Sequence, residues 1–302
     1  MSVPMSLTRG LLGIAPLKAA WRRAGESRGL HDAPAPPSLR RLCTVEHRML
    51  GGFPVTLVTP REHATGTQLV YLHGGGYVGP IIAAHWSIIT SLVLRSGATV
   101  VVPSYGLAPE HTAVEAYPFL EEVYRQALDR AAATGSPVFV GGDSAGAGLA
   151  VGLAVRCRDG ELPPPAGLLL FSPWLDVRLE SAAIAALEPR DPLLERSNLV
   201  EAGRLWAAGS PGGTADPLVS PLTDSLAGLP PAFVYQGDRD ILLPDAKTFA
   251  AKATAAGSSV QLRIYPGAIH VFVGAGWTPE AKRALADAAG RLRAHDTADD
   301  SA

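Results

Sequence analysis

Short apolar runs alternate with longer segments of helical pattern along most of the chain. The runs that we interpret as buried strands are 67–73, 98–105, 136–142, 166–172, 231–237 and 260–267. The segments with apolar residues at helical spacing are 113–133, 145–160, 245–257 and 279–295. Continuously apolar strands that alternate with helices predict a mostly parallel central sheet flanked by helices on both faces, which is the α/β class.

Two regions depart from this alternation. The segments 42–50 and 53–60 flank Gly51-Gly52, which predicts an antiparallel hairpin before the first parallel strand. From residue 172 to 229 no convincing strand is found, and so long a gap in an α/β pattern predicts an inserted helical cap. The expected organisation is an N-terminal helical arm (1–40) contributing to the cap, a catalytic domain (41–171 and 230–295), the inserted cap segment (172–229) and a disordered tail (296–302).

Composition excludes several classes of protein. The 302 residues carry a net charge of −2 and are 47% apolar, as in a globular protein with a large core and no nucleic-acid partner. No apolar run of about 18 residues is present, so we expect no stable membrane insertion. At the N-terminus Arg9 and Lys18 interrupt the apolar residues, which favours an amphipathic helix over a signal peptide.

The cysteine content bears on compartment and cofactors. Cys43 and Cys157 are too few for a disulfide framework, and no His/Cys ligand cluster accompanies them. We therefore expect reduced structural thiols, a cytoplasmic location, no metal and no organic cofactor.

The segment "VFVGGDSAGAGLA" (138–150) contains the strongest catalytic signal. Gly142-Asp143-Ser144-Ala145-Gly146 matches G-x-S-x-G, with a strand before it and a helix of small residues after it. A tight strand-to-helix turn of this kind exposes the serine and leaves room only for glycine on either side. A second match, at 25–29, lacks the preceding strand, and we interpret it as accidental. Ser144 is therefore the candidate nucleophile.

A glycine run predicts the accompanying oxyanion hole. In "YLHGGGYVG" (71–79), the N–H groups of Gly75 and Gly76 are candidates for binding the oxyanion, together with the N–H of Ala145. Gly74 and His73 would shape the turn. The same segment also matches the dinucleotide-binding pattern G-x-G-x-x-G. Pro80 and the lack of an acidic residue at the end of the next strand count against that alternative.

A base and an acid are needed to activate the serine. His270 follows the strand 260–267 in a loop, whereas His295, the other histidine after Ser144, falls in a polar terminal segment. For the acid, the segment 236–246 offers Asp238 and Asp240, which reasoning from the residues alone does not separate. Asp245 is expected to be the N-cap of the next helix, and Asp143 to be structural.

The chain resembles the bacterial hormone-sensitive-lipase-like carboxylesterases, which have the α/β-hydrolase fold. The resemblance spans about residues 40–295. The motifs that carry it are "HGGGY" at 73–77, "YGLAPEH" at 105–111, "GDSAGAG" at 142–148, "SPWLD" at 172–176, "GDRDILLPDA" at 237–246 and "GAIHVF" at 267–272. It implies an acid at Asp240, an oxyanion hole at Gly75, Gly76 and Ala145, and a cap built from the N-terminal arm and the insertion.

Some positions depart from the family pattern. Gly106 stands where an arginine is usual, Ala147 interrupts the usual glycine pair, and the segment 78–86 is unusually apolar. These changes remove no catalytic group. Candidates for the wall of the substrate pocket, with core or cap packing as the alternative, are Tyr77, Trp86, Trp174 and Trp206.

The expected function is a serine carboxylesterase acting on short-chain acyl esters through Ser144, His270 and Asp240. Alternatives left open are a deacetylase, a lactone hydrolase, a biosynthetic acyl transferase and, from another class, a non-catalytic ligand-binding receptor. The expected partner is a small acyl ester. A homodimer is left open.

Overall fold

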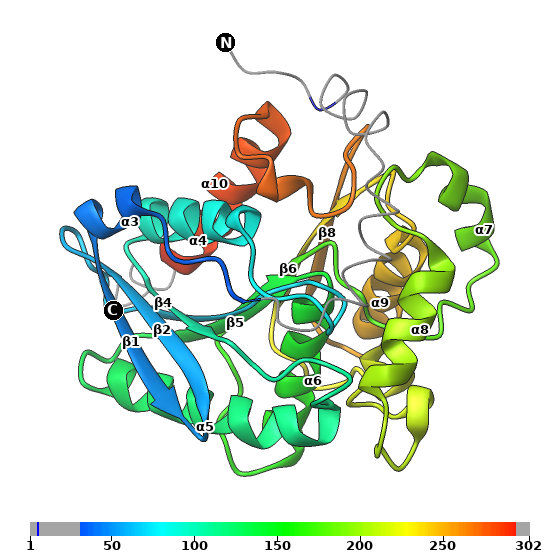
Figure 1. Ribbon diagram of the computed structural model, residues 1–302, viewed down its shortest axis with the longest axis horizontal. Coiled ribbons are helices and arrows are strands. Elements are labelled where there is room, and N and C mark those ends of the chain that lie inside the picture. The colour runs from blue at the N-terminus through cyan, green and yellow to red at the C-terminus, as the bar shows by residue number, and fades with distance from the viewer. Residues whose placement is uncertain (1–4, 6–30, 294–302) are drawn as a thin grey trace.

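The structure is a computed structural model that describes Met5 and residues 31–293. Most of the expected arm (1–40), the second G-x-S-x-G match (25–29) and the tail (296–302) lie outside the described residues. The centre of the fold is one eight-stranded sheet with the strand order β1-β2-β4-β3-β5-β6-β7-β8 (Figure 1). The strands are β1 (Cys43–Leu50), β2 (Phe53–Pro60), β3 (Gln68–Leu72), β4 (Thr99–Pro103), β5 (Val138–Asp143), β6 (Leu168–Phe171), β7 (Ala232–Gly237) and β8 (Val260–Tyr265).

The sheet is mostly parallel, as predicted. Strands β1 and β2 form the antiparallel hairpin expected around Gly51-Gly52, and β2 also pairs antiparallel with β4. From β4 through β3 to β8 every neighbouring pair is parallel. The carboxyl ends of the parallel strands therefore meet at one edge of the sheet, where ligand sites of open α/β sheets form.

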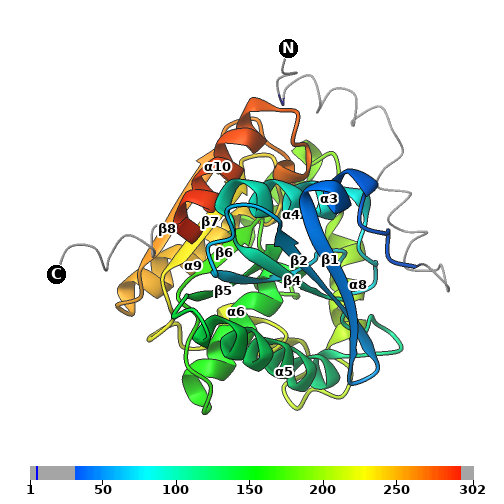
Figure 2. The ribbon, with the colours of Figure 1, turned by 90° about the vertical axis from the view of Figure 1, so that its left-hand side faces the viewer.

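Helices cover both faces of the sheet (Figures 1 and 2). The longer helices are α4 (Ala83–Ser96), α5 (Ala113–Ala132), α6 (Ala145–Asp159), α8 (Arg196–Trp206), α9 (Leu243–Ala255) and α10 (Pro279–Arg293), and α3 (Pro37–Leu42) and α7 (Ala183–Leu187) are short. Helices α4 and α10 pack on one face in one apolar cluster. Helices α5, α6 and α9 pack on the other face in a second cluster, to which α8 also contributes.

Three local features differ from the sequence expectations. Helix α4 is absent from the predicted elements, although its buried residues, among them Ile89, Leu92 and Val93, recur at helical spacing. Strand β8 is an edge strand with half its residues exposed, rather than buried. Helix α9 begins at Leu243, so the expectation that Asp245 is its N-cap is wrong; Asp245 lies in the first turn.

The segment 172–229 contains α7, α8 and short 3₁₀ turns, and no strand. It lies beside the carboxyl edge of the sheet, next to α9 (Figure 1). Within the segment the Leu222 N–H donates to Leu175 O, and Lys252 Nζ of α9 donates to Leu222 O and so ties the segment to the rest of the protein. No helix in the described part of the chain is both long and apolar enough to span a bilayer. Cys43 and Cys157 are both buried free thiols.

Candidate active site

Ser144 lies on the sharp turn between β5 and α6. Its backbone has φ 51° and ψ −119°, a conformation that a residue with a side chain rarely adopts and that stores about 1–3 kcal/mol of strain. A Cβ on Gly142 or on Gly146 would overlap the carbonyl oxygen of Leu72 in β3. The two glycines of the motif are therefore required by the close approach of β3, and together they leave the serine at the tip of the turn.

Ser144, His270 and Asp240 are brought together from three segments. The Nε2 atom of His270 lies 2.9 Å from Ser144 Oγ, and its Nδ1 atom lies 2.9 Å from Asp240 Oδ2. A carboxylate only accepts hydrogen bonds, so Nδ1–H donates to Asp240 and Nε2 is left to accept the serine proton. The arrangement can activate a serine hydroxyl for attack on a carbonyl.

The structure places Asp240, and not Asp238, against the histidine. Asp240 is fully buried, accepts a bond from Gln236 Nε2 at 2.7 Å on Oδ2, and accepts the Leu242 N–H at 2.9 Å on Oδ1. Asp238 instead accepts the Gly267 N–H at 2.7 Å and so holds the turn that leads to His270. Reasoning from the residues did not single out Gln236, although a glutamine that ends an apolar strand is a usable signal.

The surroundings of His270 act on its basicity in opposite directions. Burial of the ring lowers the pKa, but attraction by the carboxylates of Asp240, Asp191 and Asp143 outweighs burial and raises the pKa of His270 above its ordinary value. Its loop is held by the Val271 N–H, which donates to Ser172 Oγ at 3.0 Å. Val271 itself has φ 45°, an unusual conformation for a β-branched residue. The ring is therefore held in one orientation by strained backbone and a buried hydroxyl.

The glycine run after β3 lies against the serine. A Cβ on Gly74 would overlap Asp143 Oδ2 and would come 3.1 Å from Ser144 Cβ. Gly75 and Gly76 have φ values of 119° and 63°, a backbone conformation that other residues adopt only with strain. Within the described part of the chain, no backbone carbonyl accepts from the N–H groups of Gly75, Gly76 or Ala145. These N–H groups are available to an oxyanion.

Asp143 lies beneath this loop, in a buried hydrogen-bonded cluster. Tyr71 Oη donates to its Oδ1 at 2.6 Å, and His85 Nε2 lies 3.4 Å from its Oδ2. His85 Nδ1 accepts the Ile82 N–H at 2.9 Å, so the proton of a neutral His85 ring is on Nε2, facing Asp143. Burial alone raises the pKa of Asp143, but these partners together with His73 hold it below its ordinary value. The expected structural role agrees with these contacts.

An aromatic stack borders the glycine run. Tyr77, directly after the glycines, stacks on Trp206 with centroids 4.5 Å apart and on Trp174 at 5.3 Å. The backbone N–H of Trp174 donates to the carbonyl oxygen of Ser144 at 3.0 Å, so the stack adjoins the candidate nucleophile. Trp86 does not belong to it, because its indole N–H donates to Ala33 O.

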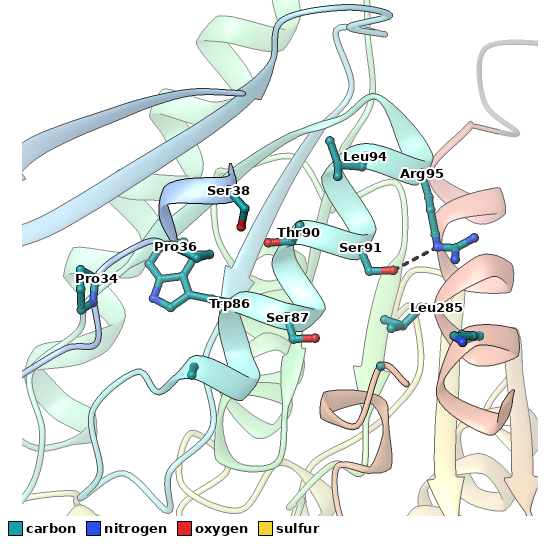
Figure 3. Close-up of a pocket in the computed structure, with 13 residues that line it drawn as sticks. Pro34, Pro36, Ser38, Trp86, Ser87, Thr90, Ser91, Leu94, Arg95 and Leu285 are labelled. Carbon is teal, nitrogen blue, oxygen red and sulfur yellow. Dashed lines mark hydrogen bonds between the residues drawn. The ribbon is translucent and has the colours of Figure 1, made fainter. Parts of the chain in front are cut away.

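Trp86 instead lines a separate groove of about 600 Å³ on the outer side of α4 (Figure 3). Ser87, Thr90, Ser91 and Leu94 form its floor along one helix face. Its walls come from residues 34–38 and from α10. None of Ser144, Asp240 and His270 contributes to its lining. Among residues 31–293, no group of three His, Cys, Asp or Glu side chains is arranged to hold a metal ion.

Comparison with known proteins shows the family of the chain. A family model for the α/β-hydrolase fold matches residues 69–274. The chain belongs to this family. An esterase of Acinetobacter venetianus is 38% identical over 231 residues, which are 76% of each chain. An acetyl-hydrolase of Streptomyces hygroscopicus is 33% identical over 232 residues, again 76% of each chain.

Solved structures of similar fold show which group within this family the chain resembles. A hormone-sensitive lipase from a metagenome library superposes with a TM-score of 0.82 at 30% identity, covering 97% of this chain and 99% of the other. The esterase EstE5, in a crystal soaked with p-nitrophenyl butyrate, gives a TM-score of 0.80 at 27% identity, covering 97% and 98%. The predicted α/β-hydrolase fold and the resemblance to bacterial hormone-sensitive-lipase-like carboxylesterases are confirmed. The protein is a carboxylic ester hydrolase.

Proposed function

We propose that the protein hydrolyses short-chain acyl esters through a Ser144–His270–Asp240 triad and an acyl-enzyme. The observation that carries the proposal is the continuous chain of hydrogen bonds from Ser144 Oγ through the His270 ring to Asp240, with 2.9 Å at each step. Asp240 holds the ring in the tautomer that leaves Nε2 free to accept a proton. An intact base also counts against the ligand-binding receptor alternative.

The reaction follows from these positions. His270 Nε2 takes the proton of Ser144 as Oγ attacks the acyl carbonyl carbon, and the carbonyl oxygen becomes an oxyanion. The N–H groups of Gly75, Gly76 and Ala145 bind that oxyanion, aided by the positive end of the α6 dipole. The protonated His270 then gives its proton to the departing alcohol. In the second half, His270 takes a proton from a water whose oxygen attacks the acyl carbon. It then gives that proton to Ser144 Oγ as the bond from Oγ to the acyl carbon breaks and the carboxylic acid leaves.

The surroundings of the nucleophile support a short acyl group. Ser144 and His270 are only 5% and 6% exposed, so the substrate must enter a confined space. The Tyr77–Trp206–Trp174 stack is buried throughout and limits that space beside the glycine run. Among the relatives, the acetyl-hydrolase is named for a two-carbon acyl group.

The direct test is hydrolysis of p-nitrophenyl acetate, butyrate and octanoate by the wild type and by Ser144→Ala. We expect turnover to fall from acetate or butyrate to octanoate, and the variant to lose about 10⁶-fold in kcat. Ser27→Ala, in the second G-x-S-x-G match, is the matched control and should keep full activity. A Ser144→Ala enzyme with near-normal kcat would exclude Ser144 as the nucleophile. Faster hydrolysis of octanoate would exclude the short-chain assignment.

A further inference from the structure

Asp191, in the inserted segment 172–229, is a buried carboxylate that the proposed mechanism does not use. It is 2% exposed and lies between the 3₁₀ turn η1 (Glu188–Arg190) and α8. Its Oδ1 atom accepts the N–H groups of Leu193 and Leu194 at 2.8 and 2.9 Å. Within the described residues, it forms no salt bridge to an arginine or lysine. Backbone N–H groups are thus its hydrogen-bond donors.

The other oxygen of Asp191 reaches out of the segment to the loop of the catalytic acid. Its Oδ2 atom accepts the Ile241 N–H at 3.0 Å, across 50 positions of sequence. Ile241 directly follows Asp240, and the next amide, of Leu242, donates to Asp240 Oδ1 at 2.9 Å. Two consecutive N–H groups just before α9 therefore donate to two different carboxylates, one from the inserted segment and one from the triad.

This contact bears on the position of the acid. The Asp240 loop sets where Oδ2 meets His270 Nδ1, at 2.9 Å, and the Ile241 amide is one peptide away from that carboxylate. If the loop loses its bond to Asp191, Ile241 keeps a buried, unpaired N–H and the loop must shift to satisfy it. A misplacement of about 1 Å in a catalytic site costs about 10²-fold in rate.

Asp191 also adds charge near the base. The carboxylates that face His270 come from three elements: Asp240 from the β7–α9 loop, Asp143 from the end of β5, and Asp191 from the inserted segment. All three favour the protonated imidazolium over the neutral ring. Removal of one negative charge therefore lowers the pKa of His270.

We propose that Asp191 is a positioning residue of the triad, through which the inserted segment holds the Asp240 loop in its active geometry. The inference rests on the triad put forward under the proposed function. On this proposal the inserted segment does two things: it covers the active site, and its packing against the Asp240 loop completes the geometry of that site.

A purely local role is the competing explanation, since Asp191-Pro192-Leu193 is a turn closed by its own carboxylate. The chain offers a matched control. Asp216-Pro217-Leu218 lies in the same segment and repeats the turn, with Asp216 Oδ1 accepting the Leu218 N–H at 2.9 Å. Its Oδ2 atom accepts the Gly212 N–H, at 3.2 Å, inside the segment. The two turns differ in that only Asp191 reaches the Asp240 loop.

The experiment compares wild type, Asp191→Asn, Asp191→Ser and Asp216→Asn on p-nitrophenyl butyrate from pH 5 to 9. Serine can keep the local turn but does not reach Ile241. For both Asp191 variants we expect kcat to fall about 10- to 100-fold, with KM changed less than about threefold. The acidic limb of kcat/KM should move to lower pH. Asp216→Asn should change kcat less than about threefold and leave the limb in place.

Two results would overturn the proposal. One is an Asp191→Asn enzyme whose kcat and acidic limb match those of Asp216→Asn. The other is loss of cooperative thermal unfolding in both Asp191 variants while Asp216→Asn folds, which would make Asp191 a general folding residue. An inactive wild type and an inactive Asp216→Asn would instead count against the proposed function itself.

Discussion

Asp245 offers a stability prediction whose size follows from the structure. It lies in the first turn of α9, is 5% exposed, and its Oδ2 atom has no hydrogen-bond partner. Arg178, the cation that acts on its charge, is already bound to Asp176, with Nη2 at 2.6 Å and Nε at 2.9 Å. Burial, and next repulsion by Asp176, raise the pKa of Asp245 from its ordinary 3.8 to about 7, against a weaker opposite effect of Arg178.

The sign of the effect on stability follows from proton binding. Between about pH 4 and pH 7 the folded protein keeps the Asp245 proton and the unfolded chain does not, so folding becomes less favourable as pH rises. The two pKa values differ by about three units, and each unit corresponds to about 1.4 kcal/mol. The raised pKa of Asp245 therefore destabilises the fold by up to about 4 kcal/mol above pH 7, by about 0.5 kcal/mol at pH 4, and by almost nothing below pH 3.

The perturbation is Asp245→Asn, which keeps the shape of the side chain and cannot ionise. We expect the variant to be more stable than wild type by about 2–4 kcal/mol at pH 8, by about 1–2 kcal/mol at pH 5, and to be nearly equal to it at pH 3 to 4. The assay is urea unfolding followed by circular dichroism at several pH values. Asp129→Asn, an exposed carboxylate on α5, is the control and should stay within about 0.5 kcal/mol throughout. A stability difference that does not change with pH would refute the reasoning.

Further predictions concern the turn at Ser144, the pKa of His270 and the aromatic stack. Gly146→Ala places a methyl against Leu72 O and should lower kcat and cost about 1–3 kcal/mol in urea unfolding. Gly290→Ala, in α10 with open space around it, should instead stabilise by about 0.5–1 kcal/mol. Because the pKa of His270 is raised, kcat/KM should fall as pH drops through a value above 6.5. An acidic limb of the kcat/KM profile centred below pH 6.5 would contradict this. Trp206→Ala, at a fully buried position, should cost about 3–5 kcal/mol by thermal unfolding.

The sequence by itself determined the features that are local in the chain. The alternation of apolar strands and helices predicted the parallel sheet, because a strand buried on both faces must be apolar throughout. The turn at Ser144 was predictable because strand, small residues and helix are adjacent in sequence, and close backbone approach explains each glycine. His270 was predictable from the position of its loop after a late strand.

Tertiary structure decided what depends on residues far apart in the chain. Asp238 and Asp240 share a loop, and only the folded turn directs one carboxylate to His270 and the other to Gly267. The partners of Asp143 lie on β3 and α4, which are far from it in sequence and meet it only in the folded protein. Asp191 has no sequence signal that separates it from Asp216, since both begin the same three-residue turn. The difference between them is one hydrogen bond to Ile241, made possible only when the segment 172–229 packs against the residues just before α9.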